Sequence, residues 1–165
     1  MHMADALLSP AVGGVMCAVS AGAVAVAAAK IKKDHLDEKK IPMMGVMGAF
    51  VFAAQMINFT IPGTGSSGHI GGGILLASIL GEFPGLLAIT AVLLIQALFF
   101  ADGGLLALGC NVFNMGVVMC LLAYPLLFKP IVRKGFTKKR IFAASIVSVV
   151  VGLQAGAFCV VLETL

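Results

Sequence analysis

Apolar residues run in long, nearly unbroken stretches along this chain, and polar residues collect between them. Six stretches can be drawn, at residues 9–29, 42–58, 70–80, 84–100, 105–128 and 141–162. Most approach the roughly 20 residues that a helix needs to span a membrane, and they lack the alternation of membrane β-strands. The 70–80 stretch is short and predicts a half-helix after an ordered loop. The pattern predicts an all-α integral membrane protein, a bundle of about six transmembrane helices.

Composition supports this prediction. Of the 165 residues, 61% are hydrophobic and 11% are charged, and the mean hydropathy is +1.11. A soluble domain has about 45–50% apolar and about 25% charged residues. The length and the absence of an internal repeat favour one transmembrane domain over residues 1–165.

The charges predict an orientation. All eleven basic residues lie in two segments, between the first and second stretches and between the fifth and sixth. The positive-inside rule places both segments in the cytoplasm, which leaves the N-terminus, the 59–69 loop and the 101–104 loop outside. Basic segments that face anionic lipid explain the net charge of +4, so no nucleic-acid partner is expected.

The N-terminal segment and the cysteines add two further expectations. The N-terminal MHMADALL has no basic segment of a signal peptide and contains Asp5, so Met1 is expected to be the uncleaved start. The four cysteines lie in or beside apolar stretches without a CxxC spacing. They are expected to be packing residues rather than a redox or zinc site.

The N-terminal Met1-His2 offers unusual chemistry. The Met1 amine and the His2 amide nitrogen can close a five-membered chelate ring on a metal, and that amide with His2 Nδ1 can close a six-membered ring. An α-amine has a pKa near about 8, so a metal can displace its proton. Three nitrogens in one plane suit Ni(II) or Cu(II) better than tetrahedral Zn(II).

His69 is the other histidine expected on the outer face, and it is the natural fourth ligand. It lies in the glycine-rich PGTGSSGHIGG, where Ser66 and Ser67 could give hydrogen-bonding support. Asn58, Asp102 and Asn111 are expected near the same face and could support the site. The alternative, left open by the residues alone, is that His69 caps the third helix and His2 is frayed.

The first stretch carries small residues at every fourth position: Gly13, Cys17, Ala21, Ala25 and Ala29. Such a stripe lets another helix approach closely. It predicts either a docking face for a partner subunit or packing inside the bundle.

Several segments resemble a known family. MHMADALLSP, GAFVFAAQMINFTIPGTGSSGHIGGG and LLIQALFFADGGLLALGCNVFNMG, with the small-residue first helix, resemble the substrate-binding membrane component of cobalt/nickel energy-coupling-factor (ECF) transporters of the CbiM/NikM type. The resemblance covers residues 1 to about 128. It differs at SSGHIGG, where many members have SCSHPTG, at Asp102, where many have histidine, and at the end of the chain, since members often continue with another helix.

The resemblance implies a function. Members capture Ni(II) or Co(II) from outside the cell, and the ligands carried over are the Met1 amine, the His2 amide and imidazole, and His69. Members work with a transmembrane coupling subunit, two cytoplasmic ATPases and often a small auxiliary membrane protein; cobalt members serve cobalamin synthesis.

Other functions fit less well. The chain lacks a Walker A motif, which excludes ATP hydrolysis by this chain, and it lacks HExxH. A site with four protein nitrogens leaves no position for a catalytic water, so no enzyme, catalytic residue or bound cofactor is expected. The alternative is an ECF component or permease for another small substrate such as a vitamin, which would leave Met1, His2 and His69 unexplained.

Overall fold

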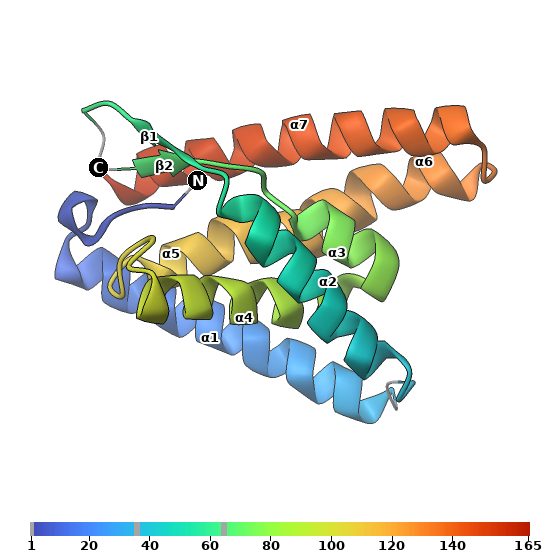
Figure 1. Cartoon of the computed structure of the whole chain (residues 1–165), viewed down its shortest axis with the longest axis horizontal. Helices are drawn as coiled ribbons and strands as arrows, with labels where there is room; N and C mark the ends of the chain where they lie inside the picture. The colour runs from blue at the N-terminus through green and yellow to red at the C-terminus, as the bar shows by residue number, and fades with distance from the viewer. Residues whose placement is uncertain (1, 35–36, 64–65) are drawn as a thin grey trace.

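The computed structural model describes residues 2–34, 37–63 and 66–165, and for Ser66 and Ser67 it describes the backbone. Helices run along the long axis of the molecule (Figure 1). The elements in chain order are η1 (Asp5–Leu7), α1 (Pro10–Lys33), α2 (Lys40–Gln55), β1 (Phe59–Ile61), β2 (Ser66–Gly68), α3 (Gly73–Leu80), α4 (Glu82–Phe99), α5 (Leu108–Val112), η2 (Phe113–Phe128), α6 (Lys129–Arg133) and α7 (Lys138–Glu163).

Each of the six predicted stretches is helical, but the helices differ in length. Among the described residues, four helices are long and apolar enough to cross a membrane: Pro10–Lys33, Glu82–Phe99, Leu108–Arg133 and Lys138–Glu163. The second stretch forms the 16-residue α2 and the third the eight-residue α3. At about 1.5 Å per residue, α3 is about 12 Å long, so it is the half-helix that its sequence predicts.

Local sequence explains where the long helices start. Ser9 accepts a hydrogen bond from the Val12 amide at 3.3 Å, and Pro10 occupies the first turn of α1, where a missing N–H costs nothing. Thr137 caps α7 in the same way through the Arg140 amide. Gly81, at φ +101°, separates α3 from α4 by a turn that other residues rarely adopt.

The fifth stretch departs from its predicted bounds. The helix starts at Leu108 rather than near residue 105 and continues past Phe128 to Arg133. Its middle part, η2, has the wider turn of a π-helix and contains Pro125. Proline normally ends an α-helix because it lacks an N–H and clashes with the carbonyl four residues earlier. In the π-helix the hydrogen bonds span five residues instead, and the helix is not interrupted at the proline.

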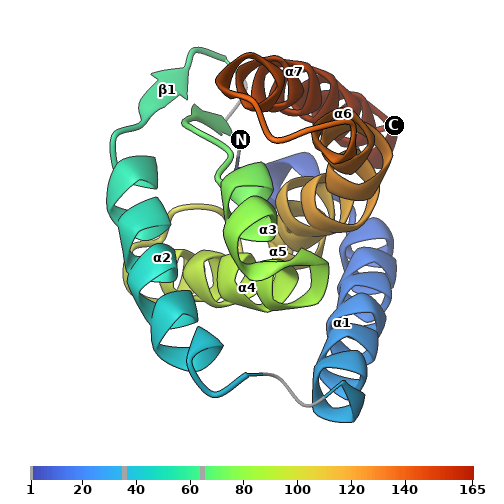
Figure 2. The same cartoon turned by 90° about the vertical axis from the view of Figure 1, so that its right-hand side faces the viewer.

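Three helices form the centre of the bundle. Buried side chains from α3, α4 and η2 make up most of the core, including Leu76, Leu80, Ile89, Met115 and Met119. In an end view α3 lies inside a ring formed by the other helices (Figure 2). The polar side chains Asn114 and Glu163 join η2 to α7 by a hydrogen bond of 2.8 Å.

Glycine brings helices into backbone contact at three crossings. A Cβ added to Gly85 would lie 2.9 Å from the Ala77 Cα, and one at Gly73 would lie 2.6 Å from the Met115 carbonyl oxygen. At Gly109 it would overlap the α1 backbone at Cys17. No side chain fits in these gaps, so the packing of α3 on α4, of α3 on η2 and of α1 on α5 requires glycine.

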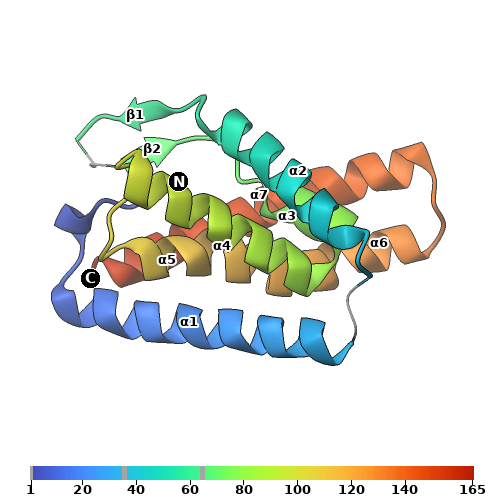
Figure 3. The same ribbon diagram turned by 60° about the horizontal axis from the view of Figure 1, so that its bottom comes forward.

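Only the first part of the small-residue stripe of α1 packs inside the bundle. Gly13 is buried against Leu106, and Cys17 packs against Gly109, so a partner cannot dock on this part of the stripe. Ala21, Ala25 and Ala29 are exposed. This exposed part lies on the half of α1 farther from the N-terminus, along one side of the bundle (Figure 3).

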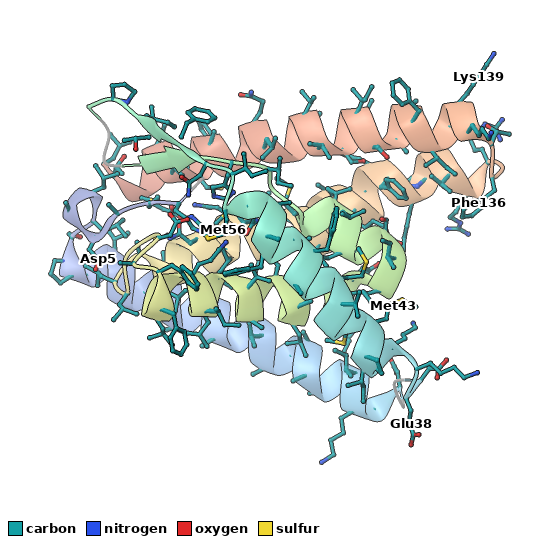
Figure 4. All side chains as sticks on the ribbon, viewed as in Figure 1. Asp5, Glu38, Met43, Met56, Phe136 and Lys139 are labelled. Atoms are coloured by element: carbon teal, nitrogen blue, oxygen red, sulfur yellow. The ribbon has the colours of Figure 1, made fainter. Side chains whose placement is uncertain are left out.

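The two basic segments lie at the same end of the bundle. Glu38, in the first segment, and Phe136 and Lys139, in the second, are at one end, whereas Asp5 is at the other (Figure 4). The N-terminal segment and the β-hairpin share this other end (Figure 1). Residues 59–69, predicted as a loop, contain the two short strands β1 and β2. The assignment of one end to the cytoplasm stays a prediction from the charges.

Candidate metal-binding site

The N-terminal segment folds back onto the start of α5 and is held there by polar contacts. The Asn111 side chain accepts from the Met3 amide at 2.8 Å and donates to the Met3 carbonyl at 3.3 Å. Asp5 Oδ1 accepts a hydrogen bond from the Ala107 amide at 2.9 Å. Asn111, predicted to support the site, therefore fixes the backbone of the residue that follows His2.

This segment brings His2 to His69. The centroids of the two imidazole rings lie 4.5 Å apart, with an angle of 35° between their planes, although 66 residues separate the two histidines in the sequence. His2 is 2% exposed, so its ring is covered by protein. The structure thus places His2 and His69 side by side, as a shared metal site requires, and the buried His2 is not frayed as in the alternative interpretation.

The β-hairpin positions His69. Strands β1 and β2 pair antiparallel, with Phe59 opposite Gly68 and Thr60 opposite Ser67. The Phe59 ring covers Gly68, and a side chain at position 68 would push this ring aside. His69 Nδ1 then lies 2.8 Å from the Ile70 carbonyl oxygen. A carbonyl only accepts, so we assign the proton to Nδ1 and the lone pair to Nε2.

Asp102 lies on the other side of His2. Its Oδ1 is 3.1 Å from His2 Nδ1, and its Oδ2 accepts a hydrogen bond from Asn58 Nδ2 at 3.1 Å. The turn that presents Asp102 includes Ala101 in the left-handed conformation, φ 51°, and the Asp102 amide donates to the Gln96 carbonyl at 3.2 Å. Asn58 and Asp102, both predicted to support the site, therefore form one hydrogen-bonded unit beside His2.

Burial keeps the two imidazoles neutral. It lowers the pKa of His69 to about 4, and it also lowers the pKa of His2, although the nearby Asp102 carboxylate opposes this shift. Both shifts move the pKa away from pH 7, so the rings keep a nitrogen lone pair under neutral conditions. A metal ion can bind only this neutral form of histidine.

Two buried amides below the site were not predicted as part of it. Gln96 Nε2 donates to Gln55 Oε1 at 3.0 Å, and Gln55 Nε2 donates to the Gly71 carbonyl at 2.7 Å. Both glutamines are 0% exposed. The Gln96 side chain lies near the His2 ring, where it opposes in small part the lowering of the pKa of His2 by burial. In the sequence, their only signal was that two polar residues interrupt apolar stretches.

Of the remaining predicted site residues, the structure describes only some. Met1 lies outside the described residues, as does His35. Ser66 and Ser67 lie on β2, where their backbones pair with Ile61 and Thr60. Within residues 2–34, 37–63 and 66–165, no group of three or more His, Cys, Asp or Glu side chains is arranged to hold a metal.

Comparison with known proteins decides the family. Residues 2–165 match the CbiM family, described as the cobalt uptake substrate-specific transmembrane region. The chain belongs to this family. As a CbiM-family member it is a multi-pass membrane protein, and the family consists of transporter components rather than enzymes.

Relatives with known names agree. The chain is 42% identical over 137 residues to a putative metal transport protein of Haloquadratum walsbyi, a match of 82% of this chain and 62% of that protein. It is 42% identical over 127 residues to the probable fused nickel transport protein LarMN of Lactiplantibacillus plantarum, covering 75% of this chain and 38% of the relative. It is 32% identical over 141 residues to the cobalt transport protein CbiM of Clostridium tetani, covering 84% and 55%. The chain therefore spans less than two thirds of these relatives.

Solved structures share the fold. A crystal structure of a truncated transition metal transporter superposes with a TM-score of 0.88 at 35% identity and covers 99% of this chain and 74% of that one. A second transition metal transporter structure gives the same TM-score and identity and is covered to 70%. The whole described bundle, including α2 and the short α3, therefore has a counterpart in transporters of this kind.

Proposed function

We propose that this CbiM-family chain captures Ni(II) or Co(II) from outside the cell, as the substrate-specific component of an ATP-driven ECF-type uptake transporter. Four nitrogens hold the ion: the Met1 amine, the His2 amide, His2 Nδ1 and His69 Nε2. The first three close the two chelate rings that the N-terminal dipeptide allows. The hydrogen bond from His69 to the Ile70 carbonyl leaves Nε2 of His69 for the metal.

The observation that carries this proposal is the contact between the His2 and His69 rings, 4.5 Å between centroids. These are two of only three histidines in the chain, and a purely structural contact would not need two imidazoles that burial keeps neutral. Asp102 adds a negative charge next to His2, which attracts a divalent cation. Planar nitrogen ligands favour Ni(II) over metals that prefer oxygen.

Transport requires partners. The chain is expected to join a transmembrane coupling subunit, two cytoplasmic ATPases and a small auxiliary membrane subunit in the plasma membrane of a prokaryote. The exposed part of the α1 stripe, at Ala21, Ala25 and Ala29, suits close packing against a helix of the coupling subunit.

The test separates a site that uses the Met1 amine from one that uses imidazoles alone. A residue added before Met1 turns the amine into an amide, and we expect Ni(II) and Co(II) affinity to collapse in an equilibrium titration. His2→Ala and His69→Ala should each abolish tight binding, whereas His35→Ala and a tag after Leu165 should not. Equal affinity of the native and extended proteins would exclude the amine as a ligand. Failure of all variants to change metal binding, or tight binding of a vitamin instead, would refute the proposed function.

A further inference from the structure

In the proposed chelate, His2 needs a hydrogen-bond acceptor for its second ring nitrogen, and none of the metal ligands can provide one. A neutral imidazole carries one proton, and when Nδ1 binds the metal this proton must sit on Nε2. His2 is 2% exposed, so water does not hydrate a donor there freely, and a buried donor without an acceptor costs about 1–3 kcal/mol. The inference below rests on the proposed function, because it concerns the same metal-bound histidine.

The two histidines differ in this respect. At His69 the second ring nitrogen already has an acceptor, the Ile70 carbonyl at 2.8 Å. At His2 neither ring nitrogen makes a well-formed hydrogen bond to the described residues, and the buried Gln96 Oε1 has none either. Gln96 lies beside this ring, because its main-chain carbonyl accepts from the amide of Asp102 at 3.2 Å and the Asp102 carboxylate is 3.1 Å from His2 Nδ1.

The hydrogen bonds of Gln55 determine which end of the Gln96 amide faces Gln55 and which end is left for other groups. The Gly71 carbonyl only accepts, so the amide group facing it at 2.7 Å must be the Gln55 NH2. This orients Gln55 Oε1 toward Gln96, and the facing group of Gln96, at 3.0 Å, must be its NH2. Gln96 then has only Oε1 left to present to other groups. Both side chains are fully buried, so neither can exchange this partner for water.

We propose that Gln96 Oε1 accepts the Nε2 proton of His2 and so holds the imidazole in the form that offers Nδ1 to the metal. Gln96 is a positioning residue, because it acts through His2 and does not touch the ion. Gln55 keeps the acceptor pointing the right way. The chain of amides starts at Gly71, two residues after His69, so it also ties the segment that carries one imidazole to the ring of the other.

Two substitutions of Gln96 distinguish a role as hydrogen-bond acceptor from a role in packing alone. Gln96→Met keeps the approximate size and removes the acceptor, and it should weaken Ni(II) binding about 10- to 100-fold, the usual cost of losing a partner behind a metal ligand. Gln96→Glu keeps an acceptor oxygen toward His2 and should bind Ni(II) more tightly than Gln96→Met. A role in packing alone predicts the opposite order, because a carboxylate in this buried position damages the core more than methionine does.

Matched control variants show whether a loss of Ni(II) affinity comes merely from destabilisation of the fold. Gln154→Met makes the same exchange at an exposed position of α7 and should leave affinity unchanged. Gln55→Met leaves the Gln96 acceptor in place and should cost less affinity than Gln96→Met. The ¹⁵N shifts of histidine-labelled protein loaded with planar, diamagnetic Ni(II) give a second readout. His2 Nε2 should appear as a protonated nitrogen with slow exchange in the wild type and with fast exchange in Gln96→Met.

The outcomes are distinguishable from failure of the proposed function. If His2→Ala binds Ni(II) like the wild type, the proposed function itself fails. If His2 is required but Gln96→Met binds like the wild type, Gln96 does not position His2. Equal losses in Gln96→Met and Gln96→Glu, or a loss in Gln55→Met as large as in Gln96→Met, would also overturn the inference. If Gln96→Glu does not fold, the comparison of Gln55→Met with Gln96→Met and the ¹⁵N exchange rate still decide.

Discussion

Gly103 allows a sharp test of how closely the protein surrounds His2. The residue has φ +82°, and a Cβ there would lie 3.3 and 3.4 Å from the Cδ2 and Cβ of His2 and 3.0 Å from Asn111 Nδ2. These contacts are closer than ordinary packing. In Gly103→Ala the methyl group must therefore displace His2, Asn111 or both by a few tenths of an ångström.

The expected size of the effect has two parts. Alanine in a left-handed conformation costs about 1–2 kcal/mol of folding stability. The displacement of His2 acts on metal binding, because metal–ligand distances tolerate only about 0.2 Å and a ring that is 2% exposed has no room to move away. We expect a loss of about tenfold in Ni(II) affinity, which corresponds to about 1.4 kcal/mol.

Gly63 provides the matched control. It has nearly the same backbone conformation, φ +76°, but a Cβ there would meet no described atom within 4 Å. Gly63→Ala should lose similar stability in a denaturant or thermal unfolding assay and keep its Ni(II) affinity in a titration. If both variants keep full affinity, the turn at Gly103 does not position His2; if both lose it equally, backbone strain rather than the contact is responsible.

Two further predictions concern acid and partner docking. The lowered pKa of His2 and the value of about 4 for His69, against about 6.5 in an unfolded chain, mean that the unfolded state takes up protons first as pH falls. The metal-free protein should therefore lose thermal stability between about pH 6.5 and 4, and His69→Gln should reduce this loss; a melting midpoint that does not change over this range would contradict the assignment. Ala25→Leu, on the exposed part of the α1 stripe, should prevent co-purification of the coupling subunit and leave metal binding intact. The same substitution at Val26, which is also exposed, should change neither co-purification nor metal binding. An equal loss of metal binding in Ala25→Leu would mean that this part of the stripe supports the fold instead.

The sequence predicted those parts of the protein that depend on one residue or on a run of similar residues. The apolar stretches located the helices. The scarcity of histidine singled out His2 and His69, and the structure brings the two rings together.

The sequence could not predict features that depend on two distant residues together. Gln55 and Gln96 are 41 positions apart, and nothing local shows that their side chains meet below His2 rather than elsewhere in the bundle. The same holds for the stripe on α1: Gly13 and Ala25 look alike in the sequence, and only the position of α5 makes one buried and leaves the other exposed.

The glycine crossings also restrict how this protein can move. At Gly73, Gly85 and Gly109 one backbone rests against another helix, so sliding any of these helices along its neighbour would force residues with a Cβ into space that only glycine fits. Helices α1, α3, α4, α5 and η2 should therefore travel as one rigid body during transport. The packing of α2 is looser, since a Cβ at Gly45 would meet nothing within 4 Å and one at Gly48 only Val92 at 3.8 Å. Amide hydrogen exchange should show that α2 opens before α1 and α4, and α2 would then be the helix that moves while the helices joined at the glycine crossings stay fixed.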